Sequence, residues 1–333
     1  MAIRIGINGF GRIGRTILRL AHSNPDVQVV QINDITTTQA MAHLLKYDSV
    51  HGVFPAEVSS TEDQIVVDGK KILYTKIADI HKIKWTDTDI VFECTGRLSG
   101  KTDNQHHLNG GAKKVIISAP ADNVDATLVM GVNEETYNPK EHHIVSNASC
   151  TTNCLAPVAK VMDELLTIKR GLMTTVHSYT NDQKIIDSVH SDLRRARAGG
   201  LNQIPTSTGA AKSIGLVLPR LKGKLDGMAI RVPTPNVSLV DFVADVEKET
   251  TAEQLNAAFR DAASKAPLKG ILSFTSEPLV STDFNGSRFS SVVDGLSTKV
   301  LDKTLVKVLA WYDNESGFST RMIEMAKYIW SKQ

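Results

Sequence analysis

Ile7-Asn8-Gly9-Phe10-Gly11-Arg12-Ile13-Gly14 is the stretch from which the fold of this 333-residue chain is best predicted. Apolar Ile3 and Ile5 precede it in the alternation of a short strand, and a helical pattern follows it to Ala21. A second strand, predicted over 27–32, ends next to Asp34, which lies 34 − 14 = 20 residues beyond the last glycine. Strand, G-x-G-x-x-G, helix, strand and acid in this order predict a dinucleotide-binding fold.

Each glycine of this motif has a physical role. Gly9 allows a tight turn, Gly11 lets the backbone approach a pyrophosphate, and Gly14 lets the helix pack on the strand. A lone G-x-G-x-x-G is more often a simple turn, but the ordered elements around this one favour the binding function. Asp34 would accept the adenosine ribose hydroxyls and would repel a 2′-phosphate, so we expect NAD rather than NADP.

Two further apolar runs predict strands that are buried on both faces of a parallel sheet. The run over 89–94 ends in Thr95-Gly96, and the run over 114–118 ends at Ser118. Because ligands bind beyond the carboxyl ends of parallel strands, Thr95, Gly96 and Ser118 are candidate cofactor residues. The alternative is that these are ordinary turn residues.

Ser149-Cys150-Thr151-Thr152 opens a helix that we predict over 151–166, after a strand-like run over 143–145. A cysteine in the first turn of a helix faces unpaired backbone N–H groups and the positive end of the macrodipole, which favour the nucleophilic thiolate. The neighbouring hydroxyls can cap the helix or hold an anion. The competing interpretation is a small buried cysteine in a capped helix.

The second half of the chain has a different predicted pattern of strands and helices. We expect a mostly antiparallel sheet with intervening helices, the helix over 251–264 carrying a capping box between Thr250 and Glu253. The expected domains are 1–149, a dinucleotide-binding domain, and 150–315, an α+β catalytic domain, with the helix over about 316–333 packing back on the first. The remaining predicted segments are strands over 172–180, 227–232, 237–247 and 306–312, a helix over 209–221, and a hairpin over 64–74.

The polar segment 178–204 is longer than an ordinary loop between two elements, and loops of this length are usually functional or disordered. Its arginines are suited to binding an anionic phosphate. A solvated, flexible excursion is the alternative. His177 ends the strand that leads into this segment. Such a histidine usually has no chemical task, but beside an activated cysteine it becomes a candidate base.

Composition excludes several classes of function. The formal net charge is +2 and no basic run is dense, so no nucleic-acid partner is expected. No apolar stretch reaches the roughly 20 residues of a membrane span, and the histidines lack metal-ligand spacing, so we expect no membrane partner and no metal. The three cysteines are too few for a disulfide framework and no signal peptide is apparent, which predicts a cytoplasmic protein.

Several motifs together resemble phosphorylating glyceraldehyde-3-phosphate dehydrogenases, over the whole length of the chain. Besides the glycine motif, extended through Arg15, these motifs are Lys46-Tyr47-Asp48-Ser49-Val50-His51-Gly52, Ser146-Asn147-Ala148-Ser149-Cys150-Thr151-Thr152-Asn153-Cys154, Thr206-Ser207-Thr208-Gly209-Ala210-Ala211-Lys212, Arg231-Val232-Pro233-Thr234-Pro235-Asn236 and Trp311-Tyr312-Asp313-Asn314-Glu315. The resemblance implies oxidation and phosphorylation of glyceraldehyde 3-phosphate through a Cys150 hemithioacetal and thioester, with His177 as base.

The same resemblance implies roles for further residues. The substrate phosphate would be held by Thr180, Arg195 and Arg231, and the attacking phosphate by Ser149, Thr151, Thr208 and Gly209. Cofactor contacts would come from Arg12, Ile13, Asp34, Ser118 and Asn314, and Thr152 is left as the expected helix cap. The segment from Ser178 to about Gly200 would line a neighbouring subunit's cofactor site in a homotetramer.

Three departures from the family pattern bear on the cofactor. Ala78 replaces an arginine beside the adenine, Ile80 replaces a proline, and Ser188-Val189 replace a Leu-Pro pair associated with NAD preference. We still expect NAD because Asp34 is kept, with dual or weak NADP use as the alternative.

Two other functions fit the same residues. Erythrose-4-phosphate dehydrogenase shares the fold, the cysteine and the histidine, but Thr208-Gly209 matches the site for inorganic phosphate. A binding protein that has lost activity is the alternative from another class, and the intact catalytic positions argue against it.

Overall fold

The computed structural model describes residues 2–333, which form two compact units. Of the described residues, unit 1 comprises 2–128, 135–148 and 319–333, and unit 2 comprises 129–134 and 149–318. Among the described residues, no helix has the length and apolar character needed to cross a membrane. Each unit has its own sheet, and the predicted combination of a Rossmann-type unit with an α+β unit is confirmed.

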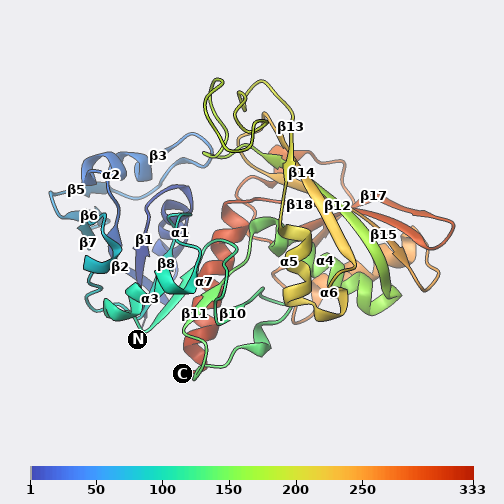
Figure 1. The fold of residues 1–333 in the computed structure, drawn as a ribbon, viewed down its shortest axis with the longest axis horizontal. Helices are drawn as coiled ribbons and strands as arrows, with labels where there is room; N and C mark the ends of the chain where they lie inside the picture. Colours follow the sequence, from blue (N-terminus) through green and yellow to red (C-terminus); the bar gives the residue numbers. More distant parts are fainter. Residues whose placement is uncertain (1) are drawn as a thin grey trace. The chain divides into compact units, whose positions relative to one another are not determined.

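Unit 1 is built on a nine-stranded sheet of order β10-β11-β9-β8-β1-β2-β7-β6-β5 (Figure 1). The strands from β10 to β7 pair in parallel, and only β5, β6 and β7 pair in antiparallel fashion. The strand order reverses between β1 and β8, which is the place where doubly wound sheets bind ligands. The strands are β1 (Ile3–Asn8), β2 (Val27–Asn33), β5 (Val58–Ser60), β6 (Gln64–Val67), β7 (Lys70–Thr75), β8 (Ile90–Glu93), β9 (Lys114–Ile117), β10 (Ala126–Thr127) and β11 (Ile144–Ser146).

The central strands of this sheet are buried on both faces. All four residues of β8 and all four of β9 are buried, as their unbroken apolar runs predict. The predicted hairpin is also present: β6 and β7 are joined through Asp68 and Gly69, both with positive φ. The other regular elements are the helices α1 (Arg12–His22), α2 (Thr38–Lys46) and α3 (Lys101–Asn109), and the short pair β3 (Tyr47–Asp48) and β4 (Gly52–Val53).

The last helix, α7 (Ser316–Ser331), belongs to unit 1 from Ser319 onward. Its contacts with that unit include the Tyr137 and Tyr328 rings, whose centroids are 6.5 Å apart, and Lys113, whose ammonium lies 5.0 Å from the centre of the Trp330 ring. The C-terminal segment therefore completes the unit that the N-terminus begins.

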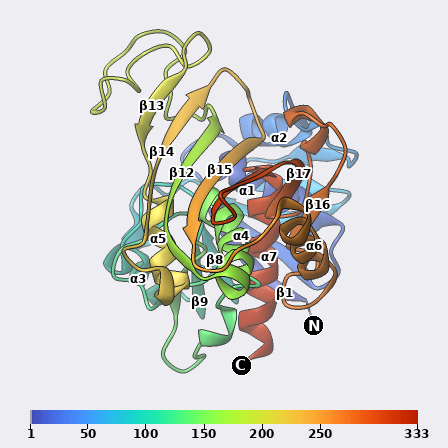
Figure 2. The same ribbon diagram turned by 90° about the vertical axis from the view of Figure 1, so that its right-hand side faces the viewer.

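Unit 2 contains a seven-stranded sheet of order β13-β14-β12-β15-β18-β17-β16 (Figure 2). The pairs β12–β14 and β16–β17 are parallel and the other pairs are antiparallel. The strands are β12 (Ile168–Ser178), β13 (Ile204–Ser207), β14 (Leu225–Val232), β15 (Ser238–Val246), β16 (Leu272–Thr275), β17 (Ser291–Leu301) and β18 (Leu305–Tyr312).

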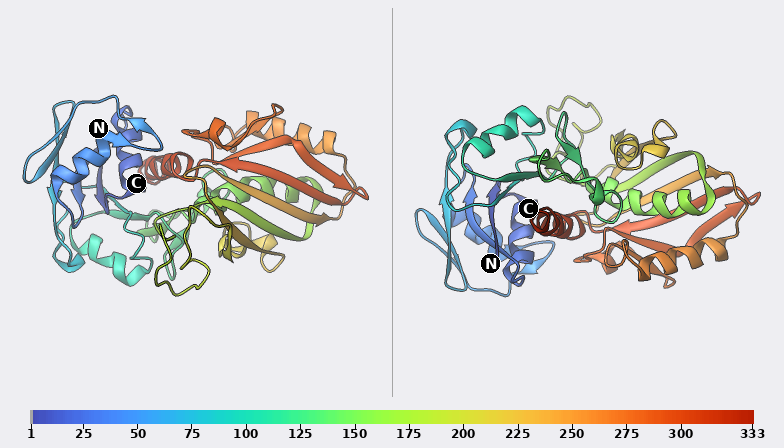
Figure 3. Two further views of the ribbon diagram at one scale, coloured as in Figure 1. Left: turned by 90° about the horizontal axis from the view of Figure 1, so that it is seen from above. Right: turned by 90° about the horizontal axis from the view of Figure 1, so that it is seen from below.

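Three helices cover one face of this sheet: α4 (Cys150–Leu166), α5 (Ala210–Val217) and α6 (Ala252–Ser264). Figure 3 shows these helices in green (α4), yellow (α5) and orange (α6) beside the sheet of unit 2, seen from two opposite sides. Alternate residues of β15 and β18 are buried, as expected for strands with helices on one face only. The four 3₁₀ helices are η1 (Ile80–Lys82), η2 (Glu134–Thr136), η3 (Pro219–Leu221) and η4 (Ser281–Phe284).

Three sequence predictions for unit 2 were wrong in detail. The capping box of α6 is formed by Thr251 and Gln254, one residue later than expected, because Thr251 has the extended backbone of a cap. The helix expected over 209–221 ends at Val217 and continues as η3, where Pro219 begins a new turn. The strand expected to reach Thr180 ends at Ser178.

Candidate active site

The N-terminus of α4 places Cys150 at the first helical position. Ser149 is the cap, since its backbone is extended (φ −102°, ψ 162°) and its Oγ accepts the Thr152 N–H at 3.0 Å. The prediction that Thr152 caps the helix was therefore wrong. The helix begins one residue earlier than expected, and a cap residue must precede the first turn.

Cys150 and His177 are brought together by α4 and the end of β12. The Cys150 Sγ and the His177 Nε2 are 3.5 Å apart, although 27 residues separate them in the chain. The His177 Nδ1 lies 2.7 Å from the Ser178 carbonyl oxygen, which can only accept a hydrogen bond. We therefore assign the proton of the neutral ring to Nδ1, which leaves the Nε2 lone pair directed at the thiol.

The electrostatics of this pair differ from the sequence prediction. Burial raises the pKa of the Cys150 thiol, although the Arg231 charge and hydrogen bonds at Thr151 act in the opposite direction. Burial, together with Arg231, lowers the pKa of His177 to about 3. The helix terminus acts in the expected direction, through backbone hydrogen bonds at Cys150 and Thr151, but burial has the larger effect on the pKa. Joint ionisation of both groups is less costly, since thiolate and imidazolium attract each other at this distance.

Arg231 is the cation nearest to this pair. Its Nη1 lies 3.0 Å from the Ser178 carbonyl oxygen and 2.9 Å from the His177 Nδ1. Since the His177 Nδ1 carries a proton in our assignment, the Ser178 carbonyl oxygen accepts hydrogen bonds from both the His177 Nδ1–H and the Arg231 Nη1–H. Within residues 2–333 the buried Arg231 Nε has no hydrogen-bond partner. A buried guanidinium with an unused donor is suited to an incoming anion.

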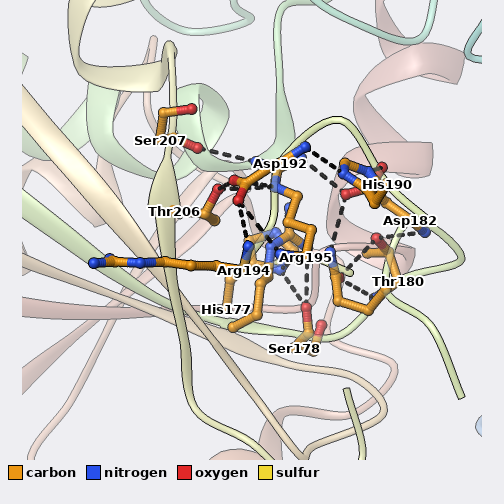
Figure 4. Close-up of polar contacts among 12 residues, drawn as sticks. His177, Ser178, Thr180, Asp182, His190, Asp192, Arg194, Arg195, Thr206 and Ser207 are labelled. Atoms are coloured by element: carbon orange, nitrogen blue, oxygen red, sulfur yellow. Dashed lines mark hydrogen bonds and ion pairs between the residues drawn. The ribbon is translucent and has the colours of Figure 1, made fainter. Parts of the chain in front are cut away.

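Arg195 reaches the same region from the segment 179–203 (Figure 4). Its Nε donates to Thr206 at 2.8 Å, its Nη1 to Asp182 at 2.8 Å, and its Nη2 to the Ser207 carbonyl at 3.1 Å. These contacts connect the segment to β13. The Thr180 backbone N–H and hydroxyl both donate to the Gln183 Oε1, at 2.9 and 3.3 Å.

The four residues predicted for the attacking phosphate come from two helix starts. Thr208 and Gly209 precede α5, where the Thr208 Oγ1 accepts the Ala210 N–H at 3.2 Å. Ser149 and Thr151 begin α4, and the Thr151 hydroxyl lies 2.8 Å from the Tyr312 hydroxyl. The sequence analysis missed Tyr312, which is buried and also lies 2.9 Å from the Thr175 hydroxyl. Its inward-facing position at the end of the alternating pattern of β18 is the signal that could have identified it.

Unit 1 brings the predicted nucleotide-binding residues together at the carboxyl ends of its strands. Gly9 has φ +90°, and a Cβ there would lie 2.7 Å from the Thr95 nitrogen. A Cβ on Gly14 would lie 2.4 Å from the Gly9 carbonyl oxygen, whereas one on Gly11 would meet no described atom within 4 Å. Gly11 also provides no side-chain cap for α1. The turn therefore has open space at Gly11, at the start of a helix, where a pyrophosphate would lie.

Asp34 and Arg12 flank this turn. The Asp34 Oδ2 accepts the Phe10 N–H at 2.7 Å, so the carboxylate lies beside the glycine motif. Arg12, followed by half-buried Ile13, forms a two-point ion pair with Asp48 at 3.0 and 3.1 Å. Burial alone would raise the pKa of Asp48, but the N–H groups of His51 and Val50 and the Arg12 guanidinium lower it to about 2.

The remaining predicted cofactor residues are also held by hydrogen bonds. Thr95 donates from its backbone N–H to Glu93 at 2.8 Å, and Gly96, with φ +68°, follows it. The Ser118 N–H donates to the Glu93 carbonyl at 3.0 Å. In unit 2 the Asn314 Oδ1 accepts from the hydroxyls of Ser178 and Ser238, each at 2.9 Å, which fixes the orientation of the amide. No group of three or more His, Cys, Asp or Glu within residues 2–333 has the arrangement of a metal site.

Comparison with known proteins identifies the family. The family model of the glyceraldehyde 3-phosphate dehydrogenase NAD binding domain matches residues 3–101, and that of the C-terminal domain matches residues 149–314. The chain belongs to the glyceraldehyde-3-phosphate dehydrogenase family. NAD is accordingly its cofactor, and the glycine turn of unit 1 fits the pyrophosphate of that cofactor.

Relatives of the same name cover the whole chain. A glyceraldehyde-3-phosphate dehydrogenase of Geobacillus stearothermophilus is 59% identical over 334 residues, covering 100% of this chain and 99% of the relative. Glyceraldehyde-3-phosphate dehydrogenase 1 of Bacillus cereus is 58% identical over 331 residues, covering 99% of each chain. A Streptomyces coelicolor glyceraldehyde-3-phosphate dehydrogenase is 52% identical over 332 residues, again covering 99% of each.

Proposed function

We propose that this protein oxidises and phosphorylates glyceraldehyde 3-phosphate to 1,3-bisphosphoglycerate with NAD, using Cys150 as nucleophile and His177 as base. The observation that carries the proposal is the distance of 3.5 Å between the Cys150 Sγ and the His177 Nε2. A thiol within reach of an unprotonated imidazole nitrogen, whose other nitrogen is held by a carbonyl, has the arrangement of an activated nucleophile. Family membership supplies the identity of the aldehyde.

In the first step the sulfur of Cys150 attacks the aldehyde carbon while its proton passes to the His177 Nε2. His177 then returns this proton to the former carbonyl oxygen, so that a hemithioacetal results and Nε2 is free again. The Nδ1–H keeps donating its hydrogen bond to the Ser178 carbonyl oxygen, which holds the ring in place during the transfer. Arg231, with its unpaired Nε, would hold the substrate phosphate together with Arg195 and Thr180.

In the second step the hemithioacetal becomes a thioester. His177 accepts the hydroxyl proton as the carbon gives up a hydride, and NAD, when bound, would supply the acceptor for that hydride. The Asn314 amide, fixed by Ser178 and Ser238, would orient the nicotinamide. Inorganic phosphate, held by Ser149, Thr151, Thr208 and Gly209, then attacks the thioester carbonyl, the C–S bond breaks, and Cys150 leaves as thiolate.

A phosphate-dependent assay of NAD reduction with glyceraldehyde 3-phosphate tests this proposal. We expect NADH formation to require inorganic phosphate and to yield an acyl phosphate. Formation of free acid without phosphate, with erythrose 4-phosphate as the better substrate, would favour an erythrose-4-phosphate dehydrogenase instead. A purified protein with no activity on either aldehyde would indicate a binding protein on the same fold.

The same assay with NADP tests the cofactor preference. Asp34 lies at the glycine turn, where its charge would repel a 2′-phosphate, so we expect higher kcat/KM with NAD. Ala78, Ile80, Ser188 and Val189 are the positions named above at which the chain departs from the family pattern. A higher kcat/KM with NADP would overturn the preference for NAD and point to these departures.

A homotetramer in the cytoplasm completes the proposal. Segment 179–203 exposes several large apolar side chains, and the uncovered face of the unit 2 sheet exposes others. Exposed apolar groups of this extent favour contact with other chains. In the segment they are Ile185, Ile186, Val189, Leu193 and Leu201, and on the sheet they are Leu172, Met228 and Leu305. All three cysteines are free, which suits a reducing compartment.

A further inference from the structure

A buried chain of hydrogen bonds crosses unit 1 at the carboxyl ends of β2, β1 and β8. It runs from Asn33 through Asn8 to Glu93, and on through His107 of α3 to Trp85. Each of these five residues is at most 4% exposed. A carboxylate in such surroundings is stable only when hydrogen bonds replace its lost hydration. Neither the catalytic steps nor the predicted cofactor contacts use this chain of residues.

The proton positions along one half of the chain are determined by donor chemistry. The Trp85 Nε1–H can only donate, and its acceptor is the His107 Nδ1 at 3.0 Å. The His107 ring therefore carries its proton on Nε2 and donates it to the Glu93 Oε2 at 3.1 Å. The Glu93 Oε2 is therefore the acceptor of this hydrogen bond, and the indole and the imidazole together fix its direction.

The other half of the chain is equally directional. The Asn33 Oδ1 accepts from the Ile77 N–H at 3.0 Å, so its Nδ2 donates to the Asn8 Oδ1 at 2.9 Å. The Asn8 Nδ2 must then donate to the Glu93 Oε2, at 2.6 Å. Neither amide can rotate by 180° without opposing two donors or two acceptors.

The second oxygen of Glu93 holds the turn that follows β8. Its Oε1 accepts the Thr95 N–H at 2.8 Å and also the Thr95 hydroxyl. That hydroxyl accepts the Arg97 N–H at 3.2 Å, so its own proton is directed at Glu93. The Thr95 nitrogen is the atom that a Cβ on Gly9 would approach to 2.7 Å. Glu93 thus fixes the backbone against which the first glycine of the nucleotide turn packs.

We propose that Glu93 is a positioning residue for NAD, holding Asn8 and Thr95 on either side of Gly9 so that the pyrophosphate-binding turn is formed before the cofactor arrives. This deepens the proposed function, since it concerns how unit 1 holds its cofactor. Preorganisation of this kind increases affinity, because the turn does not have to be ordered on binding.

Glu93→Gln is the informative substitution because it keeps the volume and changes one acceptor into a donor. If the new NH₂ takes the place of Oε2, it opposes the N–H groups of Asn8 and His107. If it takes the place of Oε1, it opposes the Thr95 N–H. Either orientation loosens one side of the Gly9 turn, and the proton pattern of the network prevents repair by an amide flip or a tautomer change.

Asp89→Asn provides a matched control at the opposite end of the same strand. The Asp89 carboxylate is buried just before β8, and it accepts from Arg4 at 3.0 and 3.1 Å and from Lys113 at 2.8 Å. The chemical change is identical, but it lies at the amino ends of the strands, where doubly wound sheets do not bind ligands. It should lower the thermal midpoint and leave NAD affinity unchanged.

The experiment is calorimetric titration of purified wild-type and variant proteins with NAD, alongside steady-state kinetics. We expect Glu93→Gln to raise the NAD Kd and KM about tenfold, while kcat at saturating NAD and the KM for glyceraldehyde 3-phosphate stay within about twofold. Wild-type affinity in Glu93→Gln, or an equal loss in Asp89→Asn, would overturn the positioning role. Wild-type protein that fails to bind NAD would instead overturn the proposed function on which this role rests.

Trp85→Phe is the second variant, for use if Glu93→Gln does not fold. It keeps the aromatic packing but removes the Nε1–H, so His107 can take its other tautomer and cease donating to Glu93. We expect a rise of about threefold in the NAD Kd with an unchanged KM for the aldehyde. An NAD Kd equal to that of the wild type would contradict the proposal.

Discussion

At the scale of single residues, Cys150 and Cys154 lie one helical turn apart in different surroundings. Cys150 faces His177, whereas Cys154 is fully buried, with its Sγ 3.5 Å from the Ser291 Oγ and 3.7 Å from the Ala310 carbonyl oxygen. Burial raises the pKa of Cys154 to about 12, and Ser291 offsets only part of this effect. Cys154 is therefore a packing residue and a poor nucleophile.

This difference leads to a prediction for two serine variants. Cys150→Ser should lower kcat by a factor on the order of 10³ or more, because a buried hydroxyl is a far weaker nucleophile and leaving group. Cys154→Ser should keep kcat within about threefold and lower the free energy of unfolding by about 1 kcal/mol. Steady-state kinetics and urea unfolding measure both effects. Similar losses of kcat in the two variants would contradict the assignment.

We expect His177, as the proposed base, to determine the charge state of Cys150. With the imidazole present, the thiol proton can pass to Nε2, and the resulting ion pair offsets the cost of burial. His177→Asn removes that acceptor and leaves a lone buried thiolate, so the pKa of Cys150 should rise further. We expect the rate of alkylation by iodoacetamide at pH 7 to fall at least about tenfold and its pH profile to move to higher pH.

His22→Asn is the control for this measurement. His22 lies in unit 1, where its Nε2 is 2.8 Å from an Asp68 oxygen, so the variant loses a histidine without touching the thiol. Its alkylation profile should match that of the wild type. An unshifted profile in His177→Asn would show that the helix terminus alone activates Cys150.

At the scale of elements, the start of α4 combines a cap with a proposed phosphate ligand. Ser149→Ala removes the Oγ that accepts the Thr152 N–H, so it should cost about 1 kcal/mol of unfolding free energy. If Ser149 also binds inorganic phosphate, the KM for phosphate should rise several-fold with little change in the KM for NAD. Urea unfolding and phosphate-dependent kinetics give the two values.

Thr251→Ala is the control that separates the loss of a helix cap from the loss of a phosphate ligand in Ser149→Ala. Thr251 caps α6 and accepts the Gln254 N–H at 3.3 Å, so its loss should cost a similar free energy of unfolding. The KM for phosphate should not change, since no residue of α6 is assigned to the site. An equal rise in both variants would mean that Ser149 acts only as a cap.

Elements with a strong local pattern were the ones that could be predicted from the sequence. The glycine turn, the buried runs that became β8 and β9, and the hairpin at Asp68-Gly69 each depend on neighbouring residues. β13, β16 and β17 were missed in unit 2. β13 and β16 have only four residues each and lie at the edges of the sheet, whereas β17 has eleven residues but its register shifts between Asp294 and Lys299. Such short strands are defined by their partners more than by their own residues.

The site shows the same division between local and distant information. Cys150 was predicted from its place at a helix start, but its distance to His177 depends on how α4 packs on the sheet that contains β12. Tyr312, which lies against Thr151 from 161 residues away, has no local signal beyond an inward-facing position in β18. Burial, which raises the pKa of Cys150 against the effect of the helix terminus, is a tertiary property that has no local signal in the sequence.

At the scale of the whole molecule, exposed apolar side chains favour a larger assembly. Ile185 is 93% exposed and Val189 is 92% exposed, both within segment 179–203. Figure 1 shows this segment extending from the strands of unit 2 as two long loops. Its own contacts are mostly polar, such as the ion pair between Arg197 and Asp187 at 2.7 Å, and leave these side chains without cover.

Ile185→Asp combined with Val189→Asp tests whether these side chains lie in an interface between chains. We expect wild-type protein to sediment as four chains and the double variant to shift to smaller species, because two charges would be buried without partners. Leu216→Asp is the control, since Leu216 is 62% exposed on α5, outside both apolar sets. If the segment lines a neighbouring subunit's cofactor site, the double variant should lose NAD affinity as well as assembly. A wild-type monomer, or a double variant that stays tetrameric with unchanged NAD affinity, would contradict this role for the segment.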